Sequence, residues 1–151
     1  IVSLGGNVQT LGTKPNGENW TVAVEDPNNT NAYVGTLSVG ETAIVTSGSY
    51  QRYFTGSDGT KYHHLIDPST GKPVDNDLVS VTIICEDGTL ADCLSTAMFI
   101  LGQKAALQYW RDNGGFDMIM ITKDNEVLCT TGLIEVFTLT NTTDYTVKMV
   151  E

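Results

Sequence analysis

The sequence has 151 residues, 40% of them hydrophobic and 17% charged, which suits one domain with a buried core and is too short for two. The formal net charge is -10 at pH 7, and such a surface repels phosphate backbones, which argues against nucleic-acid binding. A dinucleotide ligand would need a bound cation to screen its pyrophosphate. No apolar run reaches membrane-spanning length.

The first half of the chain has patterns typical of strands. Gly5-Gly6-Asn7 predicts a turn with positive φ after the opening strand, and residues 26–29 predict a second turn. Gly40-Glu41 predicts a tight hairpin between two neighbouring runs. We expect the chain to be a fragment or a processed piece, because its first residues read as the middle of a strand. The predicted strands are residues 1–4, 20–24, 33–39, 42–46 and 61–66.

The second half predicts one strand, a helical region and more strands. Residues 78–85 (LVSVTIIC) are rich in β-branched side chains and form the clearest strand. A helix is predicted from about residue 90 to 101, with an interruption at Gly102 and a second helical stretch over residues 103–112. The order predicts an α+β domain with a largely antiparallel sheet packed by helices. Further strands are predicted over residues 116–122, 126–130, 136–139 and 145–149.

The predicted helix carries a pair of oxygen-bearing side chains. Asp92 and Thr96 lie four residues apart, so they sit one above the other on the side opposite the apolar stripe. Phe99 and Ile100 lie near that side, so we expect it to be covered as well. Two oxygen ligands suit Mg²⁺, and Ser95 offers a third at the edge. The stripe expected to pack on the sheet consists of Leu94, Ala97, Met98 and Leu101.

The same residues also have structural interpretations. Asp92 is compatible with an N-cap or first-turn acid, and Thr96 with a hydrogen bond back to the helix backbone. Cys93, beside Asp92, is a candidate nucleophile, but a buried structural thiol is the favoured interpretation. With Cys85 and Cys129 it makes three cysteines without a C-x-x-C pair, which excludes a zinc site of several thiolates and leaves one disulfide open.

Two adjacent histidines lie in an extended segment. Because successive side chains of a strand alternate between its faces, His63 and His64 are predicted to lie on opposite faces. His64 shares the face of Ile66, and His63 shares that of Leu65. Residues 67–71 (DPSTG) fit a type I turn directly afterwards. A histidine beside this turn is a candidate general base near neutral pH, and a surface or capping histidine is the alternative.

Taken together, several segments resemble one enzyme family in order and spacing. The family is that of the ApbE-type FAD:protein FMN transferases, long labelled thiamine biosynthesis lipoproteins. The resemblance covers nearly the whole chain up to about Gly132, and it implies an ApbE, T-fold-like α+β domain of which residues 1–151 are the C-terminal portion. The segments are residues 4–7 (LGGN), 46–54 (TSGSYQRYF), 62–73 (YHHLIDPSTGKP), 78–82 (LVSVT) and 91–97 (ADCLSTA).

The resemblance implies a role for particular residues. Asp92 and Thr96 match the magnesium ligands of the family, and Ser95 stands where some members carry an acidic metal ligand. His64 matches the proposed base that deprotonates the acceptor hydroxyl, and Ile66 matches a residue lining the FAD site. Residues of the adjoining loops, which would shape the cofactor site, are Gly5, Gly6, Ser47, Gly48, Asp67 and Gly71.

The implied activity is that of a Mg²⁺-dependent transferase that moves FMN from FAD to a threonine or serine of an acceptor protein and releases AMP. Two alternatives are an FAD pyrophosphatase, which yields FMN and AMP, and a non-catalytic flavin-binding or structural module. The family implies an extracytoplasmic, often lipid-anchored location. Its N-terminal part, with flavin-contacting aromatics and an A-x-x-K-G segment, is absent from this sequence, so the fragment alone is expected to bind FAD poorly or to be inactive.

Overall fold

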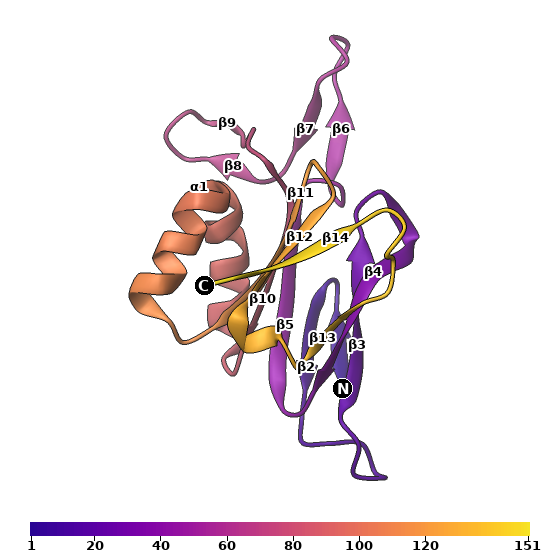
Figure 1. Ribbon diagram of the computed structural model, residues 1–151. Helices are drawn as coiled ribbons and strands as arrows, with labels where there is room; N and C mark the ends of the chain where they lie inside the picture. The colour runs from indigo at the N-terminus through magenta and orange to yellow at the C-terminus, as the bar shows by residue number, and fades with distance from the viewer.

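The computed structural model describes residues 1–151 and contains a main sheet of seven strands (Figure 1). Neighbouring strands of this sheet are antiparallel, except that the last two run parallel. The predicted largely antiparallel sheet is therefore confirmed. The strand order is β1 (Val2–Leu4), β2 (Asn7–Thr10), β5 (Thr42–Gly48), β10 (Leu78–Cys85), β11 (Asp117–Thr122), β12 (Glu126–Thr130) and β14 (Thr146–Val150).

A small sheet covers one face of the main sheet. Its order is β13 (Phe137–Leu139), β4 (Asn29–Val39) and β3 (Trp20–Asp26), and the short 3-10 helix η1 (Thr131–Leu133) precedes β13 in the chain. Alternating apolar side chains of β3 and β4 meet those of the main sheet in one buried cluster, as period-2 strands require. Its members include Val22, Val24, Leu37, Ile84, Ile119 and Ile121.

The helix α1 (Gly88–Asn113) covers the opposite face, giving three layers (Figure 1). Strand β10 lies at the centre and has every residue but Val79 buried, which fits its β-branched sequence. The second core cluster joins the sheet to the helix. It includes Val45, Val81, Ile83, Met118 and Met120 from the strands with Leu94, Met98 and Phe99 from α1.

A side-chain cap begins α1, and a break at Gly102 divides it into two halves. The Asp87 side chain accepts hydrogen bonds from the backbone N–H groups of Thr89 (2.8 Å) and Leu90 (3.2 Å), so Asp87 is the N-cap. Gly102 has φ 75° and ψ 168°, which breaks the helix where the sequence predicted an interruption. The Asn76 side-chain amide donates to the carbonyl of Phe99 at 2.7 Å and so satisfies a carbonyl at the end of the first half.

Two small hairpins lie at one end of the sheet. One pairs β6 (Tyr53–Thr55) with β7 (Lys61–His63), and the other pairs β8 (Ile66–Asp67) with β9 (Lys72–Pro73). The β6–β7 hairpin projects away from the body of the molecule (Figure 1). No helix in the structure is both long enough and apolar enough to cross a membrane.

Several local predictions are wrong. Gly40 and Glu41 do not close a hairpin, because β4 and β5 belong to different sheets. Residues 61–66 are not one strand, since the chain bends between β7 and β8. Strands β2, β6 and β9 had no predicted counterpart.

The predicted apolar stripe of the helix is also partly wrong. Ala97 is exposed and Leu101 is 48% exposed, whereas Ser95 is fully buried and Phe99 is 1% exposed. The buried face is therefore rotated toward Ser95, and only Leu94 and Met98 of the predicted stripe pack in the core.

The cysteines supply a direct test of this packing. All three thiols are free, and Cys93 is exposed, which corrects the interpretation of a buried thiol there. Burial raises the pKa of Cys129 to about 12 and also raises the pKa of Cys85. We therefore expect iodoacetamide to label the native protein once, at Cys93, because thiolates are the reactive species.

Intact-mass measurement before and after denaturation checks this prediction. One adduct is expected in the folded protein and three in urea, and the Cys93→Ala variant should take up none until it is unfolded. Two or more rapid adducts on the folded protein would contradict the burial of the other thiols.

Candidate functional site

Three hydroxyls from the end of β5 and the first half of α1 form a hydrogen-bonded cluster. Ser47 Oγ lies 2.9 Å from Ser95 Oγ and 3.1 Å from Thr96 Oγ1. Ser95 Oγ donates to the backbone carbonyl of Asp92 at 3.0 Å. Ser47 therefore contacts both helix residues, although the sequence separates it from them by 48 and 49 positions.

The direction of these hydrogen bonds follows from proton counting. A hydroxyl has one proton and two lone pairs, and Ser95 gives its proton to a carbonyl. Ser47 must then donate to Ser95, and Thr96 must donate to Ser47. The chain of donors leaves both lone pairs of Thr96 Oγ1 without a protein partner, so this oxygen is available as a ligand. Thr96 does not bond back to the helix backbone.

Asp92 lies inside the helix, four residues before Thr96. It is not the N-cap, since Asp87 holds that position, and its carboxylate makes no hydrogen bond or ion pair within the chain. The side chain is exposed, so the expectation that this helix side is covered is wrong at Asp92, although Thr96 is half-buried and Phe99 is buried. Residues i and i+4 of a helix face the same way, with β-carbons about 5–6 Å apart.

These donors fit Mg²⁺ in their chemistry. Magnesium takes oxygen ligands, commonly one or two carboxylates together with water and phosphate oxygens. Here one unpartnered carboxylate stands a helical turn from a hydroxyl oxygen with free lone pairs. No group of three or more His, Cys, Asp or Glu side chains is placed to hold a metal, so most ligands would have to be water and substrate oxygens. Ser95 is buried, donates its proton to the Asp92 carbonyl and accepts from Ser47, so it fits a supporting role better than a ligand role.

The glycines near this cluster are placed for backbone reasons. Gly5 and Gly6 have φ values of 59° and 96° and form the two-residue turn between β1 and β2, as the sequence predicted. The carbonyl of Gly6 accepts from the backbone N–H of Thr46 at 3.4 Å, which brings the turn next to Ser47. Gly48 ends β5, and a β-carbon there would lie 2.4 Å from the Tyr50 ring.

His64 lies on the bend between β7 and β8, beside the exposed Ile66. Its Nδ1 lies 3.3 Å from the carbonyl of Arg52, and its backbone N–H donates to the same oxygen at 3.2 Å. A carbonyl only accepts, so Nδ1 carries the proton in this bond. The exposed Nε2 of the neutral ring then keeps a free lone pair, which is the requirement for a general base.

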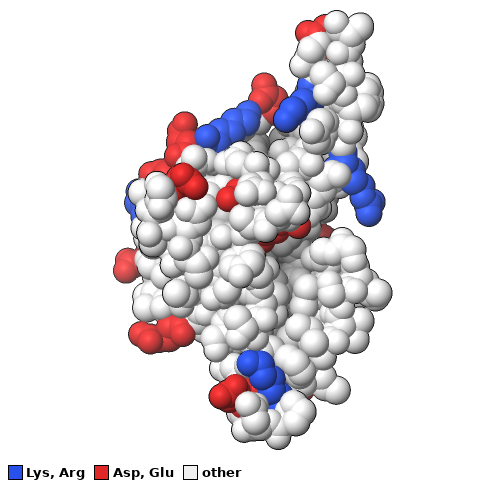
Figure 2. Space-filling model, turned by 90° about the vertical axis from the view of Figure 1, so that its right-hand side faces the viewer, with Lys and Arg blue, Asp and Glu red and all other residues white.

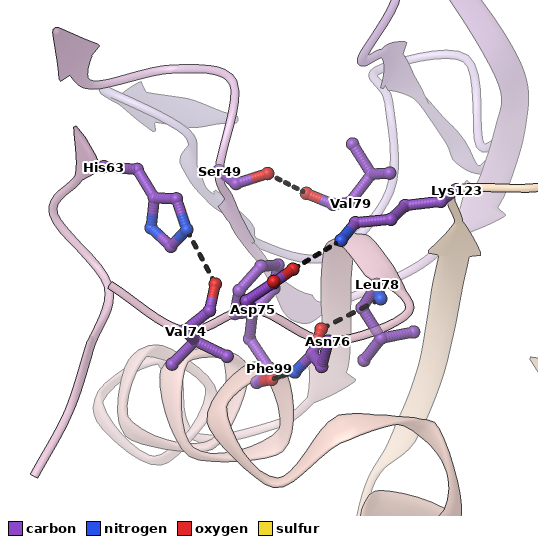
Figure 3. A network of polar contacts seen from close by, with 9 residues as sticks. All are labelled: Ser49, His63, Val74, Asp75, Asn76, Leu78, Val79, Phe99 and Lys123. Carbon is purple, nitrogen blue, oxygen red and sulfur yellow. Dashed lines mark hydrogen bonds and ion pairs between the residues drawn. The ribbon is translucent and has the colours of Figure 1, made fainter. Parts of the chain in front are cut away.

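The ring of His63 has the opposite tautomer to that of His64. Its Nδ1 accepts from the backbone N–H of Leu65 at 3.3 Å, so Nε2 carries the proton and donates to the carbonyl of Val74 at 3.0 Å (Figure 3). Its ring meets that of Phe99 edge-on, with centroids 6.1 Å apart. Both nitrogens are occupied, so His63 has a structural role in this arrangement.

The turn after Ile66 is ordered by Asp67. Its carboxylate accepts from the hydroxyl and the backbone N–H of Ser69 at 2.7 and 2.8 Å, and from Thr70 Oγ1 at 3.2 Å. Hydrogen bonds from Ser69 hold the pKa of the Asp67 carboxyl below its ordinary value. Gly71 follows with φ 67°. The predicted turn residues therefore fix the loop that holds Ile66 and His64.

The structure brings some predicted residues together and leaves others apart. Ser47, Ser95 and Thr96 touch one another, with Gly6 one hydrogen bond away through Thr46. His64 makes no hydrogen bond to this cluster. Residues that sequence reasoning missed include Asn76, whose only signal was a polar side chain before a buried strand.

Comparison with known proteins places this geometry in a family. A sequence model of the ApbE family matches residues 1–120. The FAD:protein FMN transferase of Klebsiella pneumoniae is 37% identical over 129 residues, covering 85% of this chain and 39% of the relative. The FAD:protein FMN transferase of Treponema pallidum is 37% identical over 144 residues, covering 89% of this chain and 40% of the relative.

Solved structures agree with the sequence comparison. The ApbE protein of Thermotoga maritima superposes with a TM-score of 0.70 at 38% identity, over 79% of this chain and 38% of that protein. The flavin transferase ApbE of Vibrio cholerae superposes with a TM-score of 0.67 at 29% identity, over 89% of this chain and 39% of that protein. The chain thus spans about 39% of these relatives, and over that length both its sequence and its fold match them. It belongs to the ApbE family.

Proposed function

We propose that this chain forms part of an enzyme that transfers FMN from FAD to a threonine or serine hydroxyl of an acceptor protein and releases AMP. Family membership supports the proposal, since relatives matched over most of the chain are named FAD:protein FMN transferases. The observation that carries it is the pairing of Asp92 with a Thr96 oxygen whose lone pairs are free, in a chain that also holds His64 with an open Nε2.

The chain's own residues account for three parts of the chemistry. Asp92 and Thr96 would hold a Mg²⁺ ion, which when bound neutralises charge on the pyrophosphate of FAD. Ser47 and Ser95 fix the Thr96 hydroxyl by directing its proton away from the ligand side. The hydrogen bond to Arg52 orients the His64 ring so that Nε2 can take the proton of the acceptor hydroxyl.

The atoms of the reaction balance without a redox step. A bond forms between the acceptor oxygen and the FMN phosphorus, and the bond from that phosphorus to the bridging pyrophosphate oxygen breaks. The hydroxyl proton goes to His64, and AMP departs with the bridging oxygen. Positioning and electrostatic stabilisation are expected to dominate, as in other phosphoryl transfers.

Hydrolysis of FAD to FMN and AMP is a second candidate. Its support is the exposure of His64, which leaves Nε2 open to water as well as to a protein hydroxyl. In that case water replaces the acceptor oxygen and the other residues keep their roles.

One assay separates the two candidates. The full-length protein is incubated with FAD, Mg²⁺ and a threonine-containing acceptor protein, and both the acceptor mass and the released AMP are measured. Transfer predicts an acceptor heavier by one phosphoester-linked FMN for each AMP, and EDTA should abolish both signals. AMP without a heavier acceptor would favour hydrolysis, and the absence of both products would refute the proposed activity.

A further inference from the structure

A cavity of about 620 Å³ lies beneath the two small hairpins, at the end of the main sheet. Its apolar lining includes Leu78, Val79 and Phe99, and polar contacts such as that of Asn76 with Phe99 hold the surrounding loops (Figure 3). Three lysines line it as well: Lys61 from β7, Lys72 from β9 and Lys123 from the β11–β12 turn.

The charge of this cavity is opposite to that of the protein. Its lining holds three lysines and a single acid, Asp75, in a chain with 18 acidic and eight basic residues. Figure 2 shows Lys and Arg side chains, with Asp and Glu side chains among them, around the upper end of the molecule, where the hairpins project. A larger hollow of about 1230 Å³ has the reverse balance, with Arg111 against Glu41, Glu86, Asp87, Asp117 and Glu151. Of these two hollows, the lysine-lined cavity is the one that favours an anionic ligand.

Its lysines are largely free to bind such a ligand. Lys123 Nζ lies 2.9 Å from Asp75, but both side chains are exposed, at 56% and 93%, so the pair is weak and open to exchange. Lys61 Nζ lies 4.8 Å from the centroid of the Tyr53 ring and has no carboxylate partner. Lys72 is exposed and forms no ion pair.

The projecting hairpin beside the cavity presents aromatic surface of the kind that proteins bind. Phe54 is 66% exposed and stacks on Tyr62 with ring centroids 5.2 Å apart and planes 13° apart. Tyr53 is 47% exposed. Exposed aromatic side chains next to cationic ones are enriched in protein–protein interfaces. This combination favours a polypeptide over a small free anion.

The cavity also adjoins the candidate transfer residues. His63 lines it, and His64 is the next residue along the chain. Ser49 lines it two residues after Ser47, and Phe99 lines it one helical turn after Ser95. His64 itself does not line the cavity, but it is exposed at the rim next to His63, so a polypeptide that continues past this rim would reach it.

We propose that the lysine-lined cavity and the β6–β7 hairpin dock an acidic segment of the acceptor polypeptide and so bring its hydroxyl to His64. This inference rests on the proposed transfer activity, and it assigns the acceptor's binding surface and charge. It predicts that acceptor binding weakens with salt while the apolar and aromatic contacts persist.

The test compares two charge-reversal triples in the full-length protein. The cavity variant is K61E/K72E/K123E, and the control, K14E/K104E/K148E, changes net charge equally at lysines that do not line the cavity. The probe is a short fluorescein-labelled peptide with one threonine flanked by aspartates, and asparagines replace the aspartates in the control peptide. Fluorescence anisotropy gives the peptide dissociation constants, a separate titration gives that of FAD, and thermal unfolding confirms folding.

The cavity variant is expected to bind the acidic peptide about tenfold more weakly than the wild type, while the control variant changes little. FAD binding should be equal in all three proteins. Equal loss in both triples, no loss in either, or no preference of the wild type for the aspartate peptide would overturn the proposal. Loss of FAD binding in the cavity variant would assign the lysines to the dinucleotide instead. Peptide binding requires no turnover, so these outcomes are independent of whether the transfer activity itself is found.

Discussion

Replacing Asp92 by alanine is expected to lower Mg²⁺-dependent release of AMP from FAD by at least about a hundredfold. Asp92 is the only carboxylate on the helix face shared with Thr96, so its loss removes the one charged group available to hold a cation there. The fold should tolerate the change, because the Asp92 side chain is exposed and makes no hydrogen bond within the chain. AMP release measured by chromatography over a range of Mg²⁺ concentrations checks the prediction.

Asp87→Asn is the matched control for this variant. It removes one carboxylate from the same helix but keeps a side chain able to cap it. We expect this control to retain AMP release, whereas Thr96→Val should weaken the Mg²⁺ dependence because it removes the hydroxyl proposed as a ligand. If the Asp92→Ala protein released AMP at the wild-type rate and Mg²⁺ dependence, the metal assignment would be wrong.

Replacing His64 by alanine is expected to slow FMN transfer by about a hundredfold or more, while the FAD dissociation constant stays unchanged. Without Nε2, the proton of the acceptor hydroxyl is not removed as the oxygen attacks the FMN phosphorus. Because residue 64 is exposed, added imidazole can reach the vacated position and should restore part of the rate. Acceptor mass followed over time gives the transfer rate with and without imidazole.

His63→Ala separates catalysis from structure in the same segment. It removes the hydrogen bonds with Leu65 and Val74, so a lower melting temperature is expected. The His64→Ala protein should instead melt close to the wild type, since its lost ring contact is at the surface. If the His64→Ala protein transferred FMN at the wild-type rate, His64 would not be the base. The same conclusion would follow if imidazole raised neither the rate nor the yield of transfer by this variant.

Strand positions were predictable from the sequence where burial imposes a strong pattern. The run of β10 is β-branched and almost continuously apolar because it lies at the centre of three layers. Strand pairing was not predictable in the same way. Gly40 and Glu41 look like a hairpin turn locally, yet β4 and β5 belong to two sheets. Strand β4 buries apolar side chains only in the cluster between the two sheets, whereas β5 lies in the main sheet and buries side chains on both of its faces.

The candidate site was likewise predictable from the sequence only in part. Spacing alone placed Asp92 and Thr96 on one helix face, and the family resemblance supplied their roles. Neither could show that Ser47 orients the Thr96 hydroxyl, because the two residues are 49 positions apart. The buried face of the helix was misjudged because residues 97–101 are all apolar, so the hydrophobic periodicity did not single out one buried side. Tertiary contact with Ser47 settles it by burying Ser95.

The break at Gly102 has a consequence for how this fold can vary. In an unbroken α-helix, one inserted residue rotates everything beyond it by about 100°, so the residues before and after the insertion cannot both keep their packing contacts. At Gly102 the backbone leaves helical geometry, and Asn76 terminates the preceding turn. Residues 103–113 can therefore change in length or pitch without turning the segment that carries Asp92 and Thr96, and variation among homologous sequences is expected to concentrate in this distal half.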